Sequence, residues 1–495
     1  MSWDAQKFRR EPPPELASVT DGWVVGPFHF YDVVVLSLVA FFTVGLFVVG
    51  PPLIIDDFYH MGVAQQIYRL GFVPTWDFWE YAPVGRPNLY PPLLHVAMAL
   101  LMKVSGGDVF FAARVVKVAT YPILVLCFWY SARGFTGRKA AFYSTMALAS
   151  ASPLLLVSYM IMPASLVLAL TCLLFLTFTR KMLLPSIALM AVMLWLHISM
   201  PLLTIVALLA FSLVRRREGY LVFFLKVFGF SVLLYSPWLV HVAAHMSWLS
   251  SAQMPGGVFI PLIVWALGLP ALALSFRYYR ADYFVYTLYT FSLIPVFFGY
   301  GMRFWVYVVV PVAFFVGVTL SKHVSSRGGK WRDLKIILVL VLVASALLVT
   351  PAIGGEMQAQ AGTPPLLRLP PFLSPTPFLS LLLWPPPARS MITPDLLPIY
   401  LASGWIMVNT QPFQPICYMG SDMFDASAIT AFTGRPTTGG MWREVMNPLV
   451  QMASHLYITD LGTVYVVGPP FAAPPPSVPC TLAADFGPIK IFVRT

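Results

Sequence analysis

The chain has 495 residues, of which 58% are hydrophobic and 10% are charged, and its formal net charge is +11. A soluble domain carries about 25% charged residues, so this composition excludes an ordinary soluble protein and indicates a chain embedded in a bilayer. Most of the basic excess lies before residue 352, in the connections between apolar runs, where orientation in a membrane requires it. We therefore expect membrane lipid as a partner and no nucleic acid.

Apolar runs that are long enough, or nearly long enough, to cross a bilayer follow one another through residues 1–351. A helix needs about 20 such residues to cross about 30 Å of hydrocarbon, and the pattern predicts about eleven transmembrane helices. The predicted spans are 32–50, 109–131, 140–157, 164–179, 182–200, 201–214, 220–245, 258–276, 283–298, 304–320 and 336–352. The fold class is therefore mainly α, a polytopic membrane helix bundle.

Lys and Arg residues predict how these helices are oriented. With the N-terminus in the cytoplasm, every inner connection is basic; these connections are 131–139, 180–181, 215–218, 277–282 and 321–335. The outer connections 158–163 and 246–257 contain neither Lys nor Arg, and 299–303 contains only Arg303. We expect a multi-pass protein of the cell membrane with everything after about residue 352 outside.

Two stretches are expected to lie on the outer face. The first is the loop 51–108, in which 91–104 is apolar but too short to span and predicts a helix along the interface. After a Pro-rich linker at 352–390, residues 391–495 alternate short apolar runs with helix-like stretches, which predicts a small α+β extracytoplasmic domain. Cys417 and Cys480 belong to this domain and could pair if it is extracellular.

Asp56, Asp57 and His60 follow the first span directly, where lipid gives way to water. Charge at membrane depth is expensive and is seldom placed there without a use. Two neighbouring carboxylates can bind a divalent cation or raise one another's proton affinity, and either property suits a general base or a metal site. The alternative is a solvated loop start that caps the next helix.

The rest of this loop contains Asp77, Glu80 and the string Ala-Pro-Val-Gly-Arg that ends at Arg86, followed by Tyr-Pro-Pro at 90–92. The whole stretch resembles the first outer loop of membrane glycosyltransferases with the GT-C fold. It is most similar to the catalytic subunit of oligosaccharyltransferase, especially the archaeal form. The resemblance implies that Asp56 is the catalytic, metal-binding aspartate, with Asp57 in the place of a proline. It also implies that His60, Asp77, Glu80 and Arg86 shape the pocket.

Two further strings resemble motifs of the same family. Gly-Met-Arg-Phe at 301–304 resembles the site of an arginine that contacts the phosphate of a lipid-linked sugar, and a guanidinium suits phosphate oxygens. The alternative for Arg303 is an interfacial side chain that snorkels to the membrane surface. In the C-terminal domain, Asp425 and Arg435 belong to strings that resemble the acceptor-recognition signature, although its Trp-Trp and Tyr-Gly pairs are absent.

The resemblance implies an enzyme that moves a sugar or oligosaccharide from a polyprenyl-(di)phosphate, such as dolichyl phosphate, to a glycan, lipid or protein acceptor. Arg303 would neutralise the departing phosphate, and Asp56 would act as a base or hold Mg²⁺ or Mn²⁺. The family usually carries a second acidic pair in the next outer connection, but 158–165 contains no carboxylate. Two alternatives therefore stay open, a GT-C-like scaffold without activity and a lipid or solute transporter.

Overall fold

The structure is a computed structural model of the chain. It describes residues 29–50, 53, 55–149, 154, 158, 160–248, 273, 276, 281–299, 305–325, 392, 396–420, 423–440, 464–469, 471, 473–474 and 479–495. Arg303, the predicted span 336–352 and the linker 352–390 lie outside the described residues. The predicted span 258–276 also lies outside them, apart from two isolated residues.

Each predicted span that falls within the described residues contains a helix. In the part of the chain that the structure describes, three helices are long and apolar enough to cross a membrane: α1 (Phe30–Val49), α4 (Val109–Thr136) and α10 (Tyr220–Ala244). Shorter helices are α5 (Arg138–Ala149), α7 (Pro163–Thr179), α8 (Leu183–Leu196), α9 (Met200–Val214), α12 (Phe284–Gly299) and α14 (Val309–Ser325), with 3₁₀ turns at Arg216–Glu218, Met246–Trp248 and Trp305–Val308. The helical bundle is thus confirmed. Three of its described helices meet the length of a full span, and the number of eleven stays a prediction.

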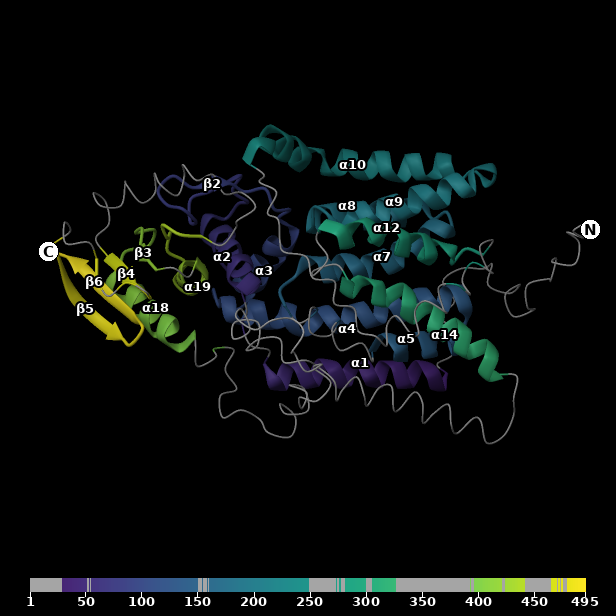
Figure 1. The fold of residues 1–495 in the computed structure, drawn as a ribbon, viewed down its shortest axis with the longest axis horizontal. Helices are drawn as coiled ribbons and strands as arrows, with labels where there is room; N and C mark the ends of the chain where they lie inside the picture. Colours follow the sequence, from purple (N-terminus) through teal and green to yellow (C-terminus); the bar gives the residue numbers. More distant parts are fainter. Residues whose placement is uncertain are drawn as a thin grey trace, which may run out of the picture.

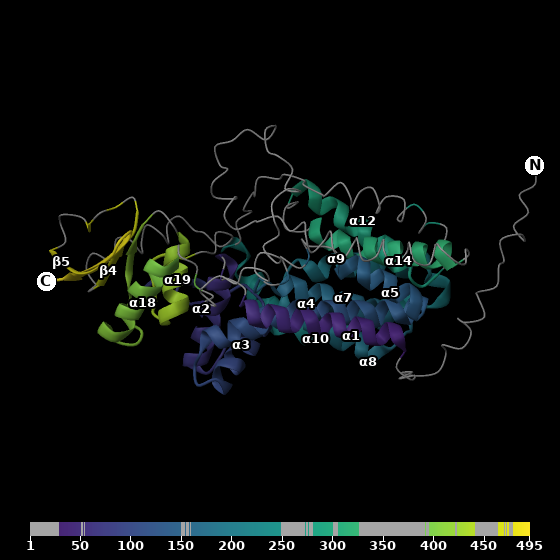
Figure 2. The ribbon, with the colours of Figure 1, turned by 90° about the horizontal axis from the view of Figure 1, so that it is seen from below.

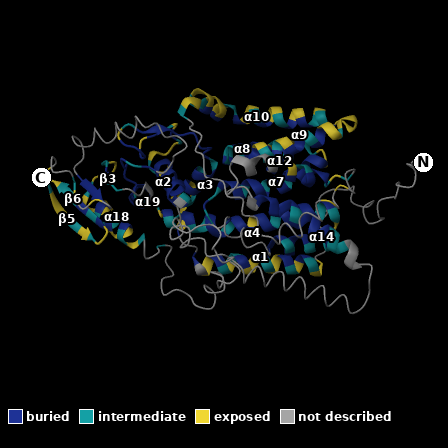
Figure 3. Ribbon diagram, in the orientation of Figure 1, coloured by how far each residue is buried: buried dark blue, intermediate teal, exposed yellow. Residues whose placement is uncertain are grey.

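The bundle helices run side by side along the long axis of the molecule, and the C-terminal domain sits at one end of them (Figures 1 and 2). We call that end the domain end and the opposite end the far end. In the most apolar stretch of α4, 61% of residues are buried, against 28% in α1 and in α10. Helix α4 is therefore the centre of the bundle, and α1 and α10 lie at its edge with apolar side chains exposed (Figure 3). A bilayer can cover those faces.

Charged groups gather at the far end. Asp32, in the first turn of α1, is buried and lies 3.7 Å from both Arg133 and Arg138. Arg215 pairs with Glu218 at 2.6 Å. The basic connections described by the structure therefore cluster away from the C-terminal domain, as the distribution of Lys and Arg predicts.

A compact layer lies between the bundle and the C-terminal domain (Figure 1). It contains α2 (Ile55–Leu70), the short strands β1 (Trp76–Asp77) and β2 (Arg86–Pro87), and α3 (Leu93–Val104). Helix α3 is the one predicted for 91–104. Helix α2 was not predicted, because its sequence mixes acidic, amide and apolar residues without a long apolar stripe.

The C-terminal domain combines helices with a four-stranded sheet, as predicted. Its elements are α18 (Leu397–Asn409), β3 (Cys417–Met419), α19 (Met423–Thr433), β4 (Val464–Val467), β5 (Cys480–Phe486) and β6 (Ile489–Arg494). The strand order is β3-β4-β6-β5, with β3 parallel to β4 and the other pairs antiparallel. Cys417 on β3 and Cys480 on β5 are free thiols, and two strands separate them in the sheet.

Candidate active site

Asp57, in the first turn of α2, is completely buried against the bundle. Its Oδ2 atom pairs with Nζ of Lys117 on α4, and its Oδ1 atom accepts a hydrogen bond of 2.7 Å from the backbone N–H of Ile161. Ile161 belongs to the connection 158–163, so its backbone amide brings that connection into contact with α2. Both bonds are needed because an uncompensated buried charge costs several kcal/mol.

Asp56 has different surroundings, although it precedes Asp57 by one residue. Adjacent residues of a helix point about 100° apart, so the two carboxylates cannot share one direction. Asp56 is half-buried, whereas Asp57 is enclosed. Because Arg303 lies outside the described residues, its approach to Asp56 stays a prediction.

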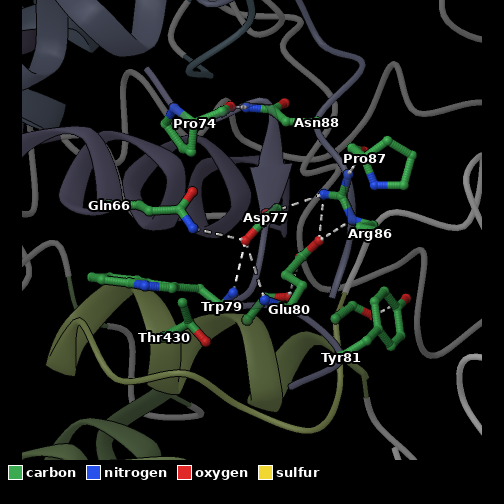
Figure 4. A network of polar contacts seen from close by, with 12 residues as sticks. Gln66, Pro74, Asp77, Trp79, Glu80, Tyr81, Arg86, Pro87, Asn88 and Thr430 are labelled. Atoms are coloured by element: carbon green, nitrogen blue, oxygen red, sulfur yellow. Dashed lines mark hydrogen bonds and ion pairs between the residues drawn. The ribbon is translucent and has the colours of Figure 1, made fainter. Parts of the chain in front are cut away.

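Asp77, Glu80 and Arg86 form a buried polar network beside α2 (Figure 4). The Nη2 atom of Arg86 lies 2.5 Å from Oε2 of Glu80 and 3.5 Å from Oδ2 of Asp77, and its Nε atom donates to the same Glu80 oxygen over 3.0 Å. The Oδ1 atom of Asp77 accepts from the Gln66 side chain at 3.2 Å and from the Trp79 amide at 2.9 Å. The network therefore joins α2 to both short strands.

The local backbone explains why these side chains meet. Strands β1 and β2 are antiparallel, and Asp77 stands directly opposite Arg86 in their register. The chain reverses between them through Gly85, whose φ of +69° favours glycine. A Cβ at Gly85 would lie 2.5 Å from the carbonyl oxygen of Asp77. Glycine is thus required both by the backbone conformation and by the close approach of the strands.

Burial and charge shift the proton affinities in this network. Burial raises the pKa of Asp77, and Glu80 adds to that effect while Arg86 opposes it. Burial would lower the pKa of Arg86, but Glu80, Tyr59 and Asp77 together outweigh it and keep that pKa above the ordinary value. Arg86 therefore stays charged between two carboxyl groups, with its guanidinium 5.6 Å from the centre of the Tyr59 ring.

The C-terminal domain closes over this network. The N–H of Thr437 donates to the carbonyl of Trp79 over 2.8 Å, and the N–H of Ala82 donates to the carbonyl of Thr437 over 2.9 Å. The hydroxyl of Ser427 on α19 donates to Oε1 of Glu80 over 3.4 Å. Among the described residues, a small space of about the size of one water molecule lies between α2, the loop and α19. In this structure Asp77, Glu80 and Arg86 thus form a closed contact between the layer and the domain.

The two predicted acceptor-side residues make bonds inside the C-terminal domain. Asp425 accepts a hydrogen bond of 2.7 Å from the hydroxyl of Tyr418. Arg435 is buried and donates to the Thr410 side chain at 3.1 Å and to the Thr410 carbonyl at 3.0 Å. The strings that contain Asp425 and Arg435 do meet the first outer loop in space, and these two side chains hold the domain in shape there.

His60 faces a second histidine that the sequence reasoning missed. Its Nδ1 atom lies 2.8 Å from Nε2 of His95 on α3, and the two rings stack with centroids 5.0 Å apart. Burial, and then the charge of Arg86, lower the pKa of His95 to about 3, so His95 is neutral near pH 7. The signal was available, because His95 is the one imidazole in the apolar run 91–104.

The described residues do not form a site for Mg²⁺ or Mn²⁺. Within them, no group of three or more His, Cys, Asp and Glu side chains is placed to hold a metal ion. Three acidic residues of the first outer loop already have cationic partners: Asp57 pairs with Lys117, and Asp77 and Glu80 pair with Arg86. A divalent cation at Asp56 therefore stays a prediction.

No protein-family model and no curated protein matches the sequence, but solved structures do. ArnT from Cupriavidus metallidurans, bound to undecaprenyl phosphate, has a TM-score of 0.64 at 14% identity, over 94% of this chain and 98% of ArnT. The archaeal oligosaccharyltransferase AglB from Archaeoglobus fulgidus, in complex with an inhibitory peptide and a dolichol-phosphate, has a TM-score of 0.60 at 11% identity, over 89% of this chain and 69% of AglB. The chain has the GT-C fold.

A third match extends the GT-C comparison. The arabinofuranosyltransferase AftD from Mycobacteria has a TM-score of 0.56 at 12% identity, over 95% of this chain, which spans 40% of the length of AftD. The GT-C resemblance drawn from the first outer loop is thereby confirmed for the fold, and it reaches across both the bundle and the C-terminal domain. Within this GT-C chain, Asp56 stands in the first turn of α2. Helix α2 belongs to the layer between the bundle and the C-terminal domain (Figure 1).

Proposed function

We propose that this chain is a membrane glycosyltransferase that moves a sugar or oligosaccharide from a polyprenyl-(di)phosphate donor to an acceptor on the outer face of the cell membrane. The observation that carries the proposal is the match over nearly the whole of both chains with ArnT, which was solved with undecaprenyl phosphate bound. The AglB structure, which contains a dolichol-phosphate and a peptide, supports the same kind of donor. Transfer on the outer face requires that the domain end of the bundle faces outward.

Asp56 is the carboxylate we assign to proton transfer. Asp57 is paired with Lys117 and enclosed, whereas Asp56 is half-buried at the start of α2. Asp56 would accept the proton of an acceptor hydroxyl while the hydroxyl oxygen bonds to the anomeric carbon of the sugar. At the same time the bond between that carbon and the phosphate oxygen breaks, and the phosphate leaves with the electron pair.

The leaving phosphate gains negative charge, and Arg303 is the residue we assign to stabilise it. A guanidinium can donate two parallel hydrogen bonds to phosphate oxygens, which fixes their position as well as their charge. The lipid tail of the donor would stay in the bilayer, so the reacting bond would sit at the membrane surface. The C-terminal domain, which contacts α2 through α19, would present the acceptor to it.

Asp56→Asn tests this assignment in the purified full-length chain, reconstituted in vesicles with a polyprenyl-phosphate sugar. Losing a general base typically costs 10²–10⁴-fold in rate, so we expect a loss of about that size with unchanged expression. Asp485→Asn, on the exposed strand β5, removes a carboxylate elsewhere and should keep full activity. A fully active Asp56→Asn variant would remove Asp56 from the mechanism.

A GT-C scaffold without activity is the second candidate, and the ion pair of Asp57 with Lys117 favours it together with the missing acidic pair in 158–165. A wild-type chain that is inert towards several polyprenyl-phosphate sugars would support the scaffold and overturn the enzyme. Mass spectrometry of cell-surface glycans with and without the gene would identify the acceptor, because the missing product names the molecule that received the sugar.

A further inference from the structure

A second cavity opens at the domain end of the bundle, between α4 and the C-terminal domain. It has a volume of about 170 Å³ and is lined by Phe110 and Arg114 of α4, by Ile392 and by Tyr400 of α18. The rings of Phe110 and Tyr400 meet edge to face with centroids 6.0 Å apart. The cavity therefore has apolar and aromatic walls and one cationic group.

Among the described residues, no carboxylate pairs with that cationic group. In the part of the chain that the structure describes, the guanidinium of Arg114 makes no hydrogen bond and no ion pair, and it is half-buried. Lys117, one turn further along α4, pairs with a buried carboxylate. A half-buried guanidinium without a counter-charge favours an anion, and its planar group of donors suits phosphate oxygens.

The cavity lies where one predicted membrane span ends. The Nη2 atom of Arg114 is 3.8 Å from the place that a Cβ on Gly50 would occupy, so the guanidinium stands beside the C-cap of α1. Along α1, the side chains of Val44, Phe47 and Val48 are 61%, 57% and 60% exposed, and their spacing of three and four residues places them on one apolar face that leads to that cap. Lipid tails fit such a face, and a lipid phosphate would then stand at the height of Arg114.

We propose that this cavity binds the phosphate headgroup of an anionic bilayer phospholipid. Arg114 would bind the phosphate, and the acyl chains would pack against the exposed face of α1. The apolar walls favour a lipid over free phosphate, because free phosphate would gain nothing from them. The inference does not rest on the proposed glycosyl transfer. The proposed reaction assigns no role to Arg114.

Lipid retention tests the proposal directly. The full-length wild-type chain, Arg114→Gln and Arg114→Lys would be reconstituted in vesicles of phosphatidylcholine and phosphatidylglycerol, extracted into mild detergent and washed, and the retained lipid measured by mass spectrometry. A cation near the membrane surface contributes about five-fold to the binding of an anionic lipid. Arg114→Gln should therefore retain about one fifth as much phosphatidylglycerol as the wild type. Arg114→Lys keeps the positive charge and should therefore keep part of the retained lipid.

Arg217→Gln is the matched control, because Arg217 is an exposed arginine at the far end of the bundle. It should retain phosphatidylglycerol as the wild type does. Equal retention by Arg114→Gln and the wild type would overturn the proposal. Displacement of the lipid by millimolar inorganic phosphate, or retention of a polyprenyl phosphate in place of phosphatidylglycerol, would also overturn it, since the site would then belong to another phosphate compound.

Discussion

The carboxylate of Asp57 and the ammonium group of Lys117 meet in the interior, where the first turn of α2 packs against α4, and neither side chain is exposed. This ion pair fixes the start of α2 and therefore the direction in which the neighbouring Asp56 points. Two adjacent acidic residues that look equivalent in the sequence therefore have different surroundings. Asp57 fastens the start of the helix, and Asp56 is the residue that we propose as the base.

Lys117→Met should destabilise the protein strongly, because it leaves the charge of Asp57 buried without a partner. Removing one member of a buried pair costs about 3–5 kcal/mol. Thermal unfolding of the purified protein in detergent measures the effect. The double variant Asp57→Asn with Lys117→Met should recover much of the loss, since it buries no charge and Asn can still accept from Ile161. Equal unfolding temperatures for the single variant and the wild type would contradict this reading of the pair.

Gly85→Ala should destabilise the layer more than Gly71→Ala does. Both glycines have a left-handed backbone, with φ of +69° and +75°, so each substitution carries a conformational cost of about 1–2 kcal/mol. A Cβ at Gly71 would meet nothing within 4 Å, whereas at Gly85 it would lie 2.5 Å from the Asp77 carbonyl oxygen. Differential scanning calorimetry of both variants separates the backbone cost from the cost of the close contact. If the two variants unfold at the same temperature, the close approach of β1 and β2 is not rigid.

Acid should weaken the folded state through His95. Its pKa is about 3 in the folded protein and 6.5 in the unfolded chain, so the unfolded chain binds the proton first as the pH falls. The contribution of His95 to the free energy of unfolding is fully present above about pH 6.5 and is lost progressively down to about pH 3. Between pH 7.5 and 5 the loss is about 2 kcal/mol. Unfolding measured at these two pH values should show a smaller difference for His95→Gln than for the wild type.

The helical bundle could be predicted because a membrane span is a long apolar run, and the runs that became α1, α4 and α10 stand out in the sequence. The mixed C-terminal domain and helix α3 could be predicted from short patterns. Helix α2 could not, because packing against α19 and α3, rather than an apolar stripe of its own, supports it. Tertiary contact decided its structure.

The candidate site was found in part. Asp56 and Asp57 were singled out by their position at a membrane boundary, but Lys117 was hidden inside a run that otherwise qualified as a span. The hydrogen bonds between Thr437 and the loop near Trp79 join residues that are hundreds of positions apart, and no local sequence pattern predicts such a contact. Sequence reasoning therefore located the residues that carry charge and missed which of them neutralise one another.

The bonds of Thr437 to Trp79 and Ala82 have a consequence for how this protein can change. The loop and the C-terminal domain supply each other's backbone partners, so neither could be exchanged alone without leaving buried amides unpaired. Changes in the domain that alter its acceptor preference would have to keep its backbone hydrogen bonds to the loop that carries Asp77 and Arg86. The two segments are thus expected to be inherited, and transplanted into a chimera, as one unit.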